Sequence, residues 1–395
     1  MRITGDQYLI KKINKSIVFD TIRQNHPISR AQISETTNLN KGTVSSLVKD
    51  LIDDNLVYEI GPGESSGGRR PVMLLFNHVA GFAIGVDLGV NYILTVLTDL
   101  EGNPVEEIRT TLENISFDSV ISTLFQSIRT LIERAPDSPR GIVGIGIGVP
   151  GIVEEKGTVL FAPNLGWKNV NLSEIVKKEF QLPVTVHNEA NAGAIGEHLF
   201  GAGKDTKNLV YVSVGIGIGT GIIINNDLYK GALGFSGEMG HSVIESHGKK
   251  CRCGNRGCWE LYASERAFLE QAKTLSIDSA DSTEEFNLDW YLQAANEGND
   301  EVIRLFHQAG EYLGIGLTNI VNTFNPELII IGNRFAKAEK WISQPIRRIV
   351  ENRALPYHRG HMKIAFSSLG AHSCALGAAS VSITNFFSDM KISVE

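Results

Sequence analysis

Three of the chain's four cysteines crowd into the segment CRCGNRGC, as Cys251, Cys253 and Cys258. Their spacing is C-x-C-x4-C, and Gly254 and Gly257 allow the backbone to turn tightly enough for the three sulfurs to face one point. The first residues, MRITGDQYLIKKINKS, lack the apolar segment of a secretory signal, and thiols in the cytoplasm stay reduced. A cluster of reduced cysteines is therefore predicted to bind a metal ion or to be catalytic, and not to form a disulfide.

The fourth ligand of such a site is predicted to be His241, with His247 as an alternative. Three thiolates and an imidazole favour Zn²⁺ in a closed tetrahedral site. A site of this kind is structural, because a catalytic zinc keeps one position open for water. We expect a structural zinc ion on His241, Cys251, Cys253 and Cys258, and we expect Cys374, which stands apart, to be a small buried residue.

The distribution of charge divides the chain into two unequal parts. Residues 1–76 carry 10 Lys and Arg against 8 Asp and Glu, whereas residues 77–395 carry 27 against 36. A mildly basic head on an acidic body favours a nucleic-acid-binding module attached to a domain with another role. No apolar run reaches the roughly 18 residues that a membrane span needs, so we expect a cytoplasmic protein.

The head has the pattern of a helix-turn-helix. The first predicted helix covers residues 7–25 and carries apolar side chains at Leu9, Ile10, Ile13, Ile17, Val18, Phe19 and Ile22. Ser29 is predicted to cap a short second helix in SRAQISETT. A third helix is predicted over residues 41–55, with an inner face of Val44, Leu47, Val48, Leu51 and Ile52. Three helices joined by a tight turn are typical of DNA-binding modules.

The outer face of the third helix carries short polar and basic side chains that suit base edges and phosphates: Asn40, Lys41, Thr43, Ser45, Ser46 and Lys49. After it, LVYEI and VMLLFN predict a two-stranded wing whose Gly-rich tip carries Arg69 and Arg70, which are expected to reach the DNA backbone or the minor groove. The alternative is a small helical dimerisation module with a solvated face. The wing favours DNA binding.

The body, from residue 81 onward, consists of buried strands that run into Gly or Asn turns and alternate with helices, which predicts an α/β fold with mixed sheets. A strand followed by a Gly-rich turn occurs twice, in AIGVDLGV and VYVSVGIGIGTG, so we expect a duplicated, two-lobed body with a ligand cleft. Neither turn matches a phosphate-binding Walker loop or a dinucleotide-binding GxGxxG. The predicted domains are residues 1–80 and 81–395, the latter with lobes of 81–192 plus the C-terminal helix, and 193–371.

The segments GEMGH (237–241), CRCGNRGCWE and YAS resemble the signature of the ROK family, which contains repressors and sugar kinases. The resemblance implies a winged helix-turn-helix followed by a two-lobed, actin/hexokinase-like sugar-binding domain. It also implies a set of sugar contacts, with His241 binding zinc through one ring nitrogen and the sugar through the other: Asn188, Glu189, Glu238, His241, Glu260 and, less central, Asn164 in PNLGW.

The resemblance leaves two functional classes, an enzyme and a sensor. Kinases of the family carry DxGGTK in the first turn, whereas this chain reads DLGVNY (87–92), with Val90 and Asn91 in place of the GT. Glu189 stands where the kinases place a catalytic Asp, although the second turn, GIGIGTG, keeps its glycines. We therefore expect a non-catalytic sensor, with a sugar kinase of residual activity as the alternative.

For a sensor, the resemblance implies a homodimeric repressor that binds double-stranded operator DNA and is released by D-xylose. Glucose as a competitor, another sugar, or a sugar phosphate stays open as the ligand. Glu189 is one methylene longer than Asp and would fill the space that the exocyclic CH₂OH of a hexose needs. Our hypothesis is that this residue favours a pentose over glucose.

Overall fold

The head of the computed structural model is a three-helix unit with a small sheet. The structure describes residues 7–62, 71–275, 287–360 and 362–391. The three helices are α1 (Gln7–Asn25), α2 (Arg30–Thr37) and α3 (Lys41–Asp53), which confirms the three predicted helices. The wing strands β2 (Val57–Pro62) and β3 (Val72–Phe76) pair antiparallel, and β1 (Ile28–Ser29) adds a third strand that the sequence pattern did not predict. Arg69 and Arg70 lie outside the described residues.

Side-chain caps define where two of the head helices begin. Ser29 accepts a hydrogen bond from the backbone N–H of Gln32, and the Gln32 side chain accepts one from the Ser29 backbone, so the pair forms a capping box at α2. The Asn40 side chain accepts from the Thr43 N–H at 2.8 Å and caps α3. These bonds satisfy N–H groups that the first turn of a helix leaves free.

The prediction of one continuous apolar stripe on α1 was wrong. Val18, Phe19 and Ile22 are buried, but Ile10, Ile13 and Ile17 are 52%, 42% and 41% exposed. At about 100° per residue the two sets lie on different sides of the helix, and the small head covers only one of them.

The first lobe of the body is built on a five-stranded mixed sheet of order β11-β7-β4-β5-β6. Its strands are β4 (Phe82–Leu88), β5 (Tyr92–Asp99), β6 (Pro104–Thr111), β7 (Ile142–Val149) and β11 (Val184–Asn188). A second sheet in this lobe comprises β8 (Ile152–Val153), β9 (Thr158–Ala162) and β10 (Trp167–Asn171). The helices α4 (Phe117–Arg134) and α5 (Leu172–Phe180) pack on these strands, and Trp167 is buried in their core.

The second lobe repeats the same topology, in the order β14-β13-β12-β15-β16. Its strands are β12 (Leu209–Val214), β13 (Ile218–Ile224), β14 (Asp227–Leu228), β15 (Leu328–Gly332) and β16 (Lys363–Phe366). In both sheets the first strand pairs antiparallel with the second and parallel with the fourth. The repeated pattern confirms the duplicated, two-lobed α/β body that the paired glycine-rich turns predicted.

Helices cover the second lobe and join the two lobes. Those of the second lobe are α7 (Glu260–Ala263), α8 (Glu265–Ala272), α9 (Leu288–Asn296), α10 (Asp300–Phe324), α11 (Glu339–Arg353) and α12 (Pro356–Arg359). Short 3-10 turns occur at η1 (His78–Ala80), η2 (Met239–His241), η3 (Arg334–Ala338) and η4 (Gly370–His372).

None of the described helices is long and apolar enough to cross a membrane.

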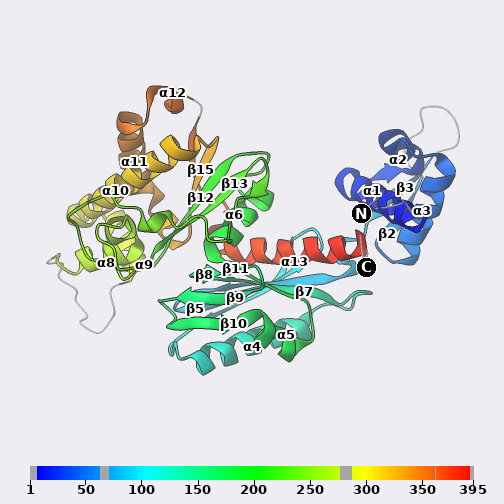
Figure 1. Ribbon diagram of the computed structural model, residues 1–395, viewed down its shortest axis with the longest axis horizontal. Coiled ribbons are helices and arrows are strands. Elements are labelled where there is room, and N and C mark those ends of the chain that lie inside the picture. Colours follow the sequence, from blue (N-terminus) through cyan, green and yellow to red (C-terminus); the bar gives the residue numbers. More distant parts are fainter. Residues whose placement is uncertain (1–6, 63–70, 276–286, 361, 392–395) are drawn as a thin grey trace.

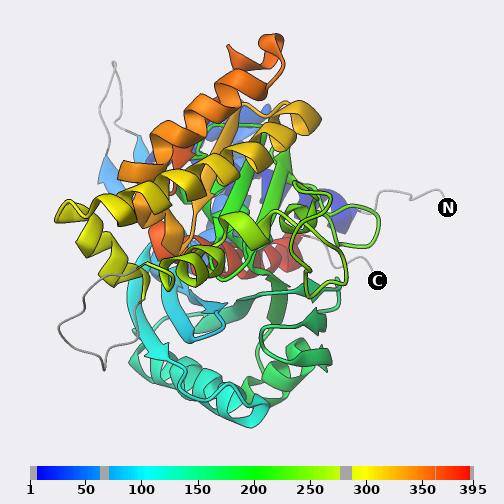
Figure 2. The same ribbon diagram turned by 90° about the vertical axis from the view of Figure 1, so that its left-hand side faces the viewer.

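Two helices cross between the lobes. Helix α6 (Glu189–Phe200) packs on the second sheet, and α13 (Ser373–Lys391) packs on the first. Figure 1 shows α13 running along the first lobe toward the head, and Figure 2 shows it between the two lobes. Cys374, near the start of α13, is buried as expected.

Candidate functional site

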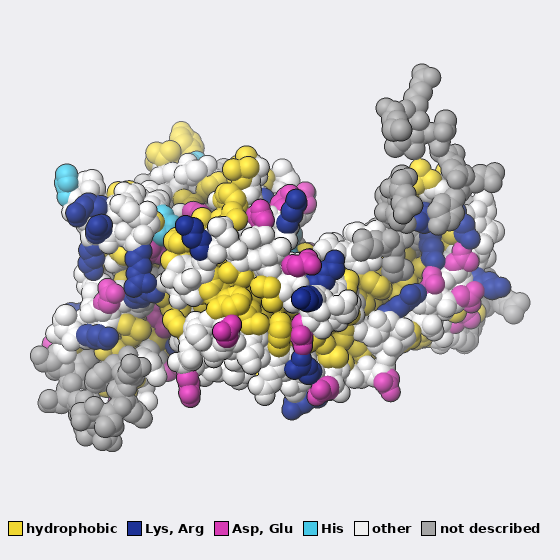
Figure 3. Space-filling model, turned by 60° about the horizontal axis from the view of Figure 1, so that its bottom comes forward, with side chains coloured by type: hydrophobic (Ala, Val, Ile, Leu, Met, Phe, Trp, Pro, Cys, Tyr) yellow, Lys and Arg dark blue, Asp and Glu magenta, His cyan; other side chains and the backbone are white. Residues whose placement is uncertain are grey.

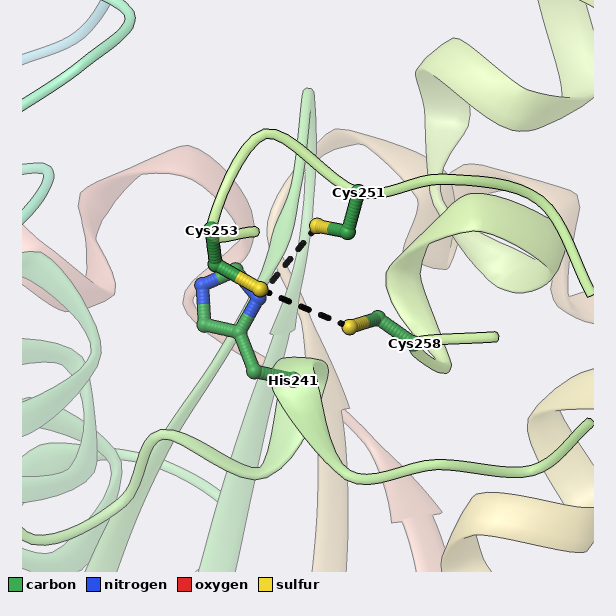
Figure 4. Close-up of side chains that lie close together, drawn as sticks. All are labelled: His241, Cys251, Cys253 and Cys258. Carbon is green, nitrogen blue, oxygen red and sulfur yellow. Dashed lines mark hydrogen bonds between the residues drawn. The ribbon is translucent and has the colours of Figure 1, made fainter. Parts of the chain in front are cut away.

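The predicted metal ligands converge on one point. The ligand atoms of His241, Cys251, Cys253 and Cys258 all lie within 4.8 Å of one another (Figure 4). The sulfurs of Cys253 and Cys258 are 3.7 Å apart, and the Cys251 sulfur lies 3.8 Å from His241 Nδ1. A tetrahedral zinc with Zn–S bonds of about 2.3 Å has ligand–ligand edges of about 3.8 Å, so the donor set and its spacing fit zinc. His247 is not part of this described cluster.

Local backbone geometry closes the segment. Gly254 and Gly257 adopt positive φ angles of 96° and 72°, a region that side-chain-bearing residues rarely enter. A Cβ at Gly257 would overlap the carbonyl oxygen of Glu245, so the chain approaches itself too closely there for any other residue. The Cys251 N–H donates to the carbonyl oxygen of Asn255 at 2.8 Å, which completes the turn. The glycines therefore permit the turn that brings the sulfurs together, as their spacing predicted.

A cavity of about 420 Å³ lies between the lobes, next to this cluster. All six side chains expected to contact sugar line it: Asn164, Asn188 and Glu189 from one side, and Glu238, His241 and Glu260 from the other. The two groups are separated by about fifty residues of sequence, and only the meeting of the two lobes brings them together.

The imidazole of His241 lies between the metal cluster and the cavity. Its Nδ1 faces the Cys251 sulfur, whereas its Nε2 lies 4.0 Å from Glu238 Oε2. Glu260 Oε1 is 3.5 Å from His241 Nδ1 and accepts from the Cys251 thiol at 3.3 Å. Burial raises the pKa of Glu238, the charge of His241 lowers it, and the charge of Glu260 raises it further. The Cys₃His cluster thus contributes to one wall of the cavity through His241 and Cys253.

Asn188 and Glu189 join the end of β11 to the start of α6. The Asn188 side-chain oxygen accepts from the N–H groups of Ala190 and Asn191, and its amide donates to the carbonyl of Gly151 at 2.9 Å. Its carboxamide therefore caps α6 and fixes the adjoining loop of the first lobe. This backbone role was not foreseen from the sequence.

Glu189 is held by side chains that the sequence reasoning missed. Its Oε1 accepts from the hydroxyl of Ser213 at 2.8 Å and from the amide of Asn333 at 2.7 Å. Ser213 lies near the end of β12, and Asn333 directly follows β15. Both are polar residues at the ends of apolar strands, a signal that PELIIIGN already carried. The two bonds fix the Glu189 carboxylate against the second lobe.

A third missed residue lines the cavity and links the two lobes. Arg266, on α8 of the second lobe, donates to the side-chain oxygen of Asn164 at 2.9 Å. Asn164 belongs to the loop between β9 and β10 of the first lobe. Because the guanidinium occupies the carboxamide oxygen, the NH₂ group of Asn164 is the part left for another partner.

The first glycine-rich turn is filled by one of its own side chains. The Tyr92 hydroxyl donates to Asp87 Oδ2 at 2.6 Å, and a Cβ on Gly89 would overlap the Tyr92 ring. The Arg109 guanidinium lies 4.4 Å from the centre of the same ring. Burial, followed by the nearby Glu189 carboxylate, raises the pKa of Asp87 to about 7, and burial also raises the pKa of Glu189.

This environment predicts a pH effect on stability. The pKa of Asp87 rises from 3.8 to about 7 on folding, so the folded state keeps a proton that the unfolded chain releases. The resulting stabilisation is present at low pH and is lost as the pH rises through about 7. An Asp87→Asn variant, which mimics the protonated acid, should show a shallower fall of melting temperature between about pH 5 and pH 8. The control is Asp118→Asn, at an exposed position near the start of α4. Its melting temperature should fall with pH as steeply as that of the wild type. An equal dependence of melting temperature on pH in all three proteins would contradict the assignment.

The proposed DNA-facing side chains lie on one side of α3. Lys41, Ser45, Ser46 and Lys49 are exposed, and Thr43 is half-buried, while the opposite face of the helix packs into the head. Asn40 is exposed as well, although its side-chain oxygen is used in the cap. On the face drawn in Figure 3, basic and acidic side chains of the head are interspersed. The short side chains of α3 leave room for a close approach to a nucleic acid groove.

The molecule thus combines a winged helix-turn-helix with a two-lobed α/β body that has a cavity beside a Cys₃His cluster. Residues 83–385 match the ROK family, and the chain belongs to that family. It is 45% identical to the xylose repressor of Bacillus spizizenii, over 98% of this chain and 99% of that protein. The likeness therefore includes the head as well as the body.

Solved structures agree with this assignment and show the range of the family. A ROK family transcriptional regulator, described as a homologue of the Escherichia coli MLC protein, matches 97% of this chain and 98% of its own with a TM-score of 0.81 at 29% identity. A ROK family glucokinase from Streptomyces griseus, in complex with glucose and AMPPNP, matches 76% of this chain and 99% of its own with a TM-score of 0.70 at 29% identity. The family thus contains regulators and kinases that share the fold of the two-lobed body.

Proposed function

We propose that this protein is a sugar-responsive transcriptional repressor that binds double-stranded operator DNA and is released by D-xylose. The observation that carries the proposal is the 45% identity to a xylose repressor across almost the whole chain, head included. In this proposal residues 1–80 bind DNA and residues 81–395 bind sugar. The lobes are 81–192 with the C-terminal helix, and 193–371.

The proposed sugar site uses the side chains that line the cavity. Carboxylates of Glu238 and Glu260 accept hydrogen bonds from neighbouring sugar hydroxyls, and the NH₂ group of Asn164 donates to a hydroxyl oxygen. His241 forms its hydrogen bond to the sugar through Nε2, since its Nδ1 faces the Cys251 sulfur. We assign the cluster of His241, Cys251, Cys253 and Cys258 to a structural Zn²⁺, which would fix the tautomer and orientation of the imidazole.

Arg266 is proposed to position Asn164. Without the guanidinium, the Asn164 carboxamide is free to rotate and to offer the sugar its oxygen in place of its NH₂ group. An Arg266→Ala variant should therefore bind xylose about 10-fold more weakly, which corresponds to about one lost hydrogen bond between Asn164 and the sugar. Arg266→Lys should recover part of the affinity, because it restores a donor. The control is Arg304→Ala, at an exposed position on α10, whose xylose affinity by calorimetry should equal that of the wild type. Full xylose affinity in Arg266→Ala would contradict the proposal that Arg266 positions Asn164.

Glu189 is proposed to favour a pentose. Its carboxylate is held in place by Ser213 and Asn333, so its extra methylene cannot easily withdraw from the cavity. A Glu189→Asp variant should raise the affinity for glucose relative to xylose, by about 10-fold if one methylene decides the fit. Titration of both sugars measures this ratio, and unchanged selectivity would remove the hypothesis.

The competing function is that of a sugar kinase, which the likeness to a glucokinase favours. Two features of the site argue against it. Tyr92 fills the first glycine-rich turn, where backbone N–H groups would have to approach a phosphate, and it binds Asp87. The carboxylate of Glu189, at the position that the resemblance assigns to the catalytic base, is already bound by two donors. We therefore propose that the protein does not transfer phosphate.

Repression is proposed to depend on a homodimer that presents two copies of α3 to half-sites about one DNA turn, or about 34 Å, apart. Sugar binding favours an orientation of the heads that fits the two half-sites poorly, and glucose competes with xylose. Xylose must then bind the DNA-incompetent state more tightly. By linkage, operator DNA should weaken xylose binding by the same factor by which xylose weakens DNA binding.

The test is fluorescence anisotropy with a palindromic DNA from upstream of a xylose operon, measured with xylose, glucose or ATP. The proposal expects release by xylose alone and a weakening of xylose binding by DNA that equals the weakening of DNA binding by xylose. Formation of phosphorylated sugar after incubation with ATP would establish the kinase instead. Unequal factors would contradict the linkage scheme.

A further inference from the structure

Helix α13 connects α6 to the head. Its 19 residues span about 28 Å at 1.5 Å per residue, from the crossing with α6 to the core of the winged module. Figure 1 shows this path along the first lobe. We propose that α13 transmits the state of the sugar cavity to the DNA-binding head, through its crossing with α6 at one end and through Phe387 at the other. This inference rests on the proposed function and names the route of its regulation.

The first turn of α13 is tied to the cavity through α6. The Ser373 hydroxyl donates to Glu197 at 2.7 Å, a fully buried carboxylate near the end of α6. Helix α6 begins at Glu189, which lines the cavity and is bound by Ser213 and Asn333 of the second lobe. A movement of the second lobe that accompanies sugar binding therefore reaches α6 directly.

The crossing of α6 and α13 leaves no side chains between the two backbones. A Cβ at Gly377 of α13 would overlap the carbonyl oxygen of Ala192 in α6. On its other side α13 lies equally close to the first sheet, where a Cβ at Gly146 would overlap the carbonyl oxygen of Ala378. Backbones in direct contact cannot absorb a displacement by changing rotamers, so a shift of α6 must move α13 or the sheet.

The other end of α13 belongs to the core of the head. Phe387 is 3% exposed, and its ring centre lies 5.1 Å from that of Phe19 on α1 and 6.0 Å from that of Phe76 on β3. The Arg23 guanidinium lies 5.2 Å from the same ring centre. The ring of Phe387 therefore touches both the first helix and the wing strand, and a displacement of α13 acts on the whole head.

Helix α1 passes such a displacement on to α3, the proposed DNA-recognition helix. Lys11 and Lys15 of α1 form ion pairs with Asp50, on α3, and Asp54, which directly follows it, at 2.7 and 2.5 Å. The buried faces of α1 and α3 also share one apolar core. The orientation of α3 therefore depends on the helix that Phe387 supports.

Among the described residues, none from the second lobe belongs to the apolar core around Phe387. Among the residues that the structure describes, the cluster around Phe387 draws only on the head, the first lobe and α13. The first lobe also contacts the head through polar groups, with Arg140 bonded to Asp54 and His26 paired with Glu101 at 3.0 Å. Sugar-dependent movement of the second lobe must therefore pass through α6 and either α13 or the first lobe, and Phe387 distinguishes these routes.

The experiment compares coupling in wild type, Phe387→Ala and Phe387→Leu. Three constants are measured for each protein: xylose affinity without DNA, and operator affinity without and with saturating xylose. We expect wild-type operator affinity to fall at least about 10-fold with xylose, within the usual range of allosteric coupling. In Phe387→Ala, xylose should lower the operator affinity by less than about 3-fold, while the xylose affinity stays within about 2-fold of wild type. In Phe387→Leu, the xylose-induced loss of operator affinity should be intermediate. Phe125→Ala, which removes a ring packed edge-on against Phe180 in the first lobe, should couple like wild type.

The outcomes separate this inference from the proposed function. If xylose and other sugars fail to release the wild type from operator DNA, the proposed function and the inference both fail. If wild type is released and Phe387→Ala is released to the same extent, only the inference fails. Should Phe387→Ala not fold, hydrogen exchange of the wild type decides: xylose without DNA should change amide protection in the second half of α13 and in α1. Unchanged protection there at saturating xylose overturns the inference.

Discussion

A Cys258→Ser variant is expected to lose both its metal ion and its affinity for sugar. Cys258 is fully buried, and the next residue, Trp259, is fully buried too and donates its ring N–H to the carbonyl of Tyr312 at 2.9 Å. Structural zinc in small sites contributes about 10–16 kcal/mol, as much as the whole stability of a typical domain. Since His241 is both a proposed ligand and a wall of the cavity, release of the ion frees the imidazole and the neighbouring Glu260.

Metal analysis and calorimetry measure both effects. We expect about one zinc per wild-type chain, almost none in Cys258→Ser, and xylose affinity lower by about 100-fold or more, at the upper end of losses seen when metal-site support is removed. The matched control is Cys374→Ser, a buried cysteine remote from the cluster, which should retain its zinc. Full zinc content in Cys258→Ser would show that the thiol is not a ligand.

The second large effect is expected at the recognition helix. Ser46 is exposed on α3, so a Ser46→Glu change leaves the core of the head intact and places a negative charge against the phosphates. The loss of one polar contact costs about 1–3 kcal/mol, and repulsion by the phosphates adds to it, so operator affinity should fall at least about 100-fold. Xylose binding should not change, because the cavity lies in the body.

Ser116→Glu provides the control for this prediction. It adds the same charge at an exposed position before α4, where the serine side chain makes no capping bond. Anisotropy at one fixed salt concentration should find its operator affinity close to that of wild type. If both variants lose affinity equally, net charge and not the α3 face governs binding.

The sequence predicted those parts of the site that depend on near neighbours. The spacing of Cys251, Cys253 and Cys258 with two intervening glycines predicted a closed cluster, and the four ligand atoms do converge. The capping of α2 by Ser29 followed from the need to satisfy free N–H groups in the first turn. The stripe on α1 was predicted wrongly at Ile10, Ile13 and Ile17, because apolar spacing does not say how much of a helix its neighbours cover.

Contacts between distant segments were beyond such reasoning. Arg266 and Asn164 are 102 residues apart, and Asn333 and Glu189 are 144 apart, so no local pattern links either pair. Both pairs depend on how the two sheets face each other. The same is true of Phe387, whose position in the core of the head follows only from the path of α13 across the first lobe.

By itself, then, the sequence predicted the convergence of the Cys₃His cluster, the winged head and the duplication of the body, because each rests on patterns visible within short segments: the spacing of cysteines and glycines, the periodicity of helices and strands, and a strand that runs into a glycine-rich turn. Only the tertiary structure decided that Glu189 is bound by Ser213 and Asn333, that Arg266 reaches across the cavity to Asn164, and that α13 ends inside the head. The physical reason is that these contacts form between surfaces that meet only after both lobes have folded.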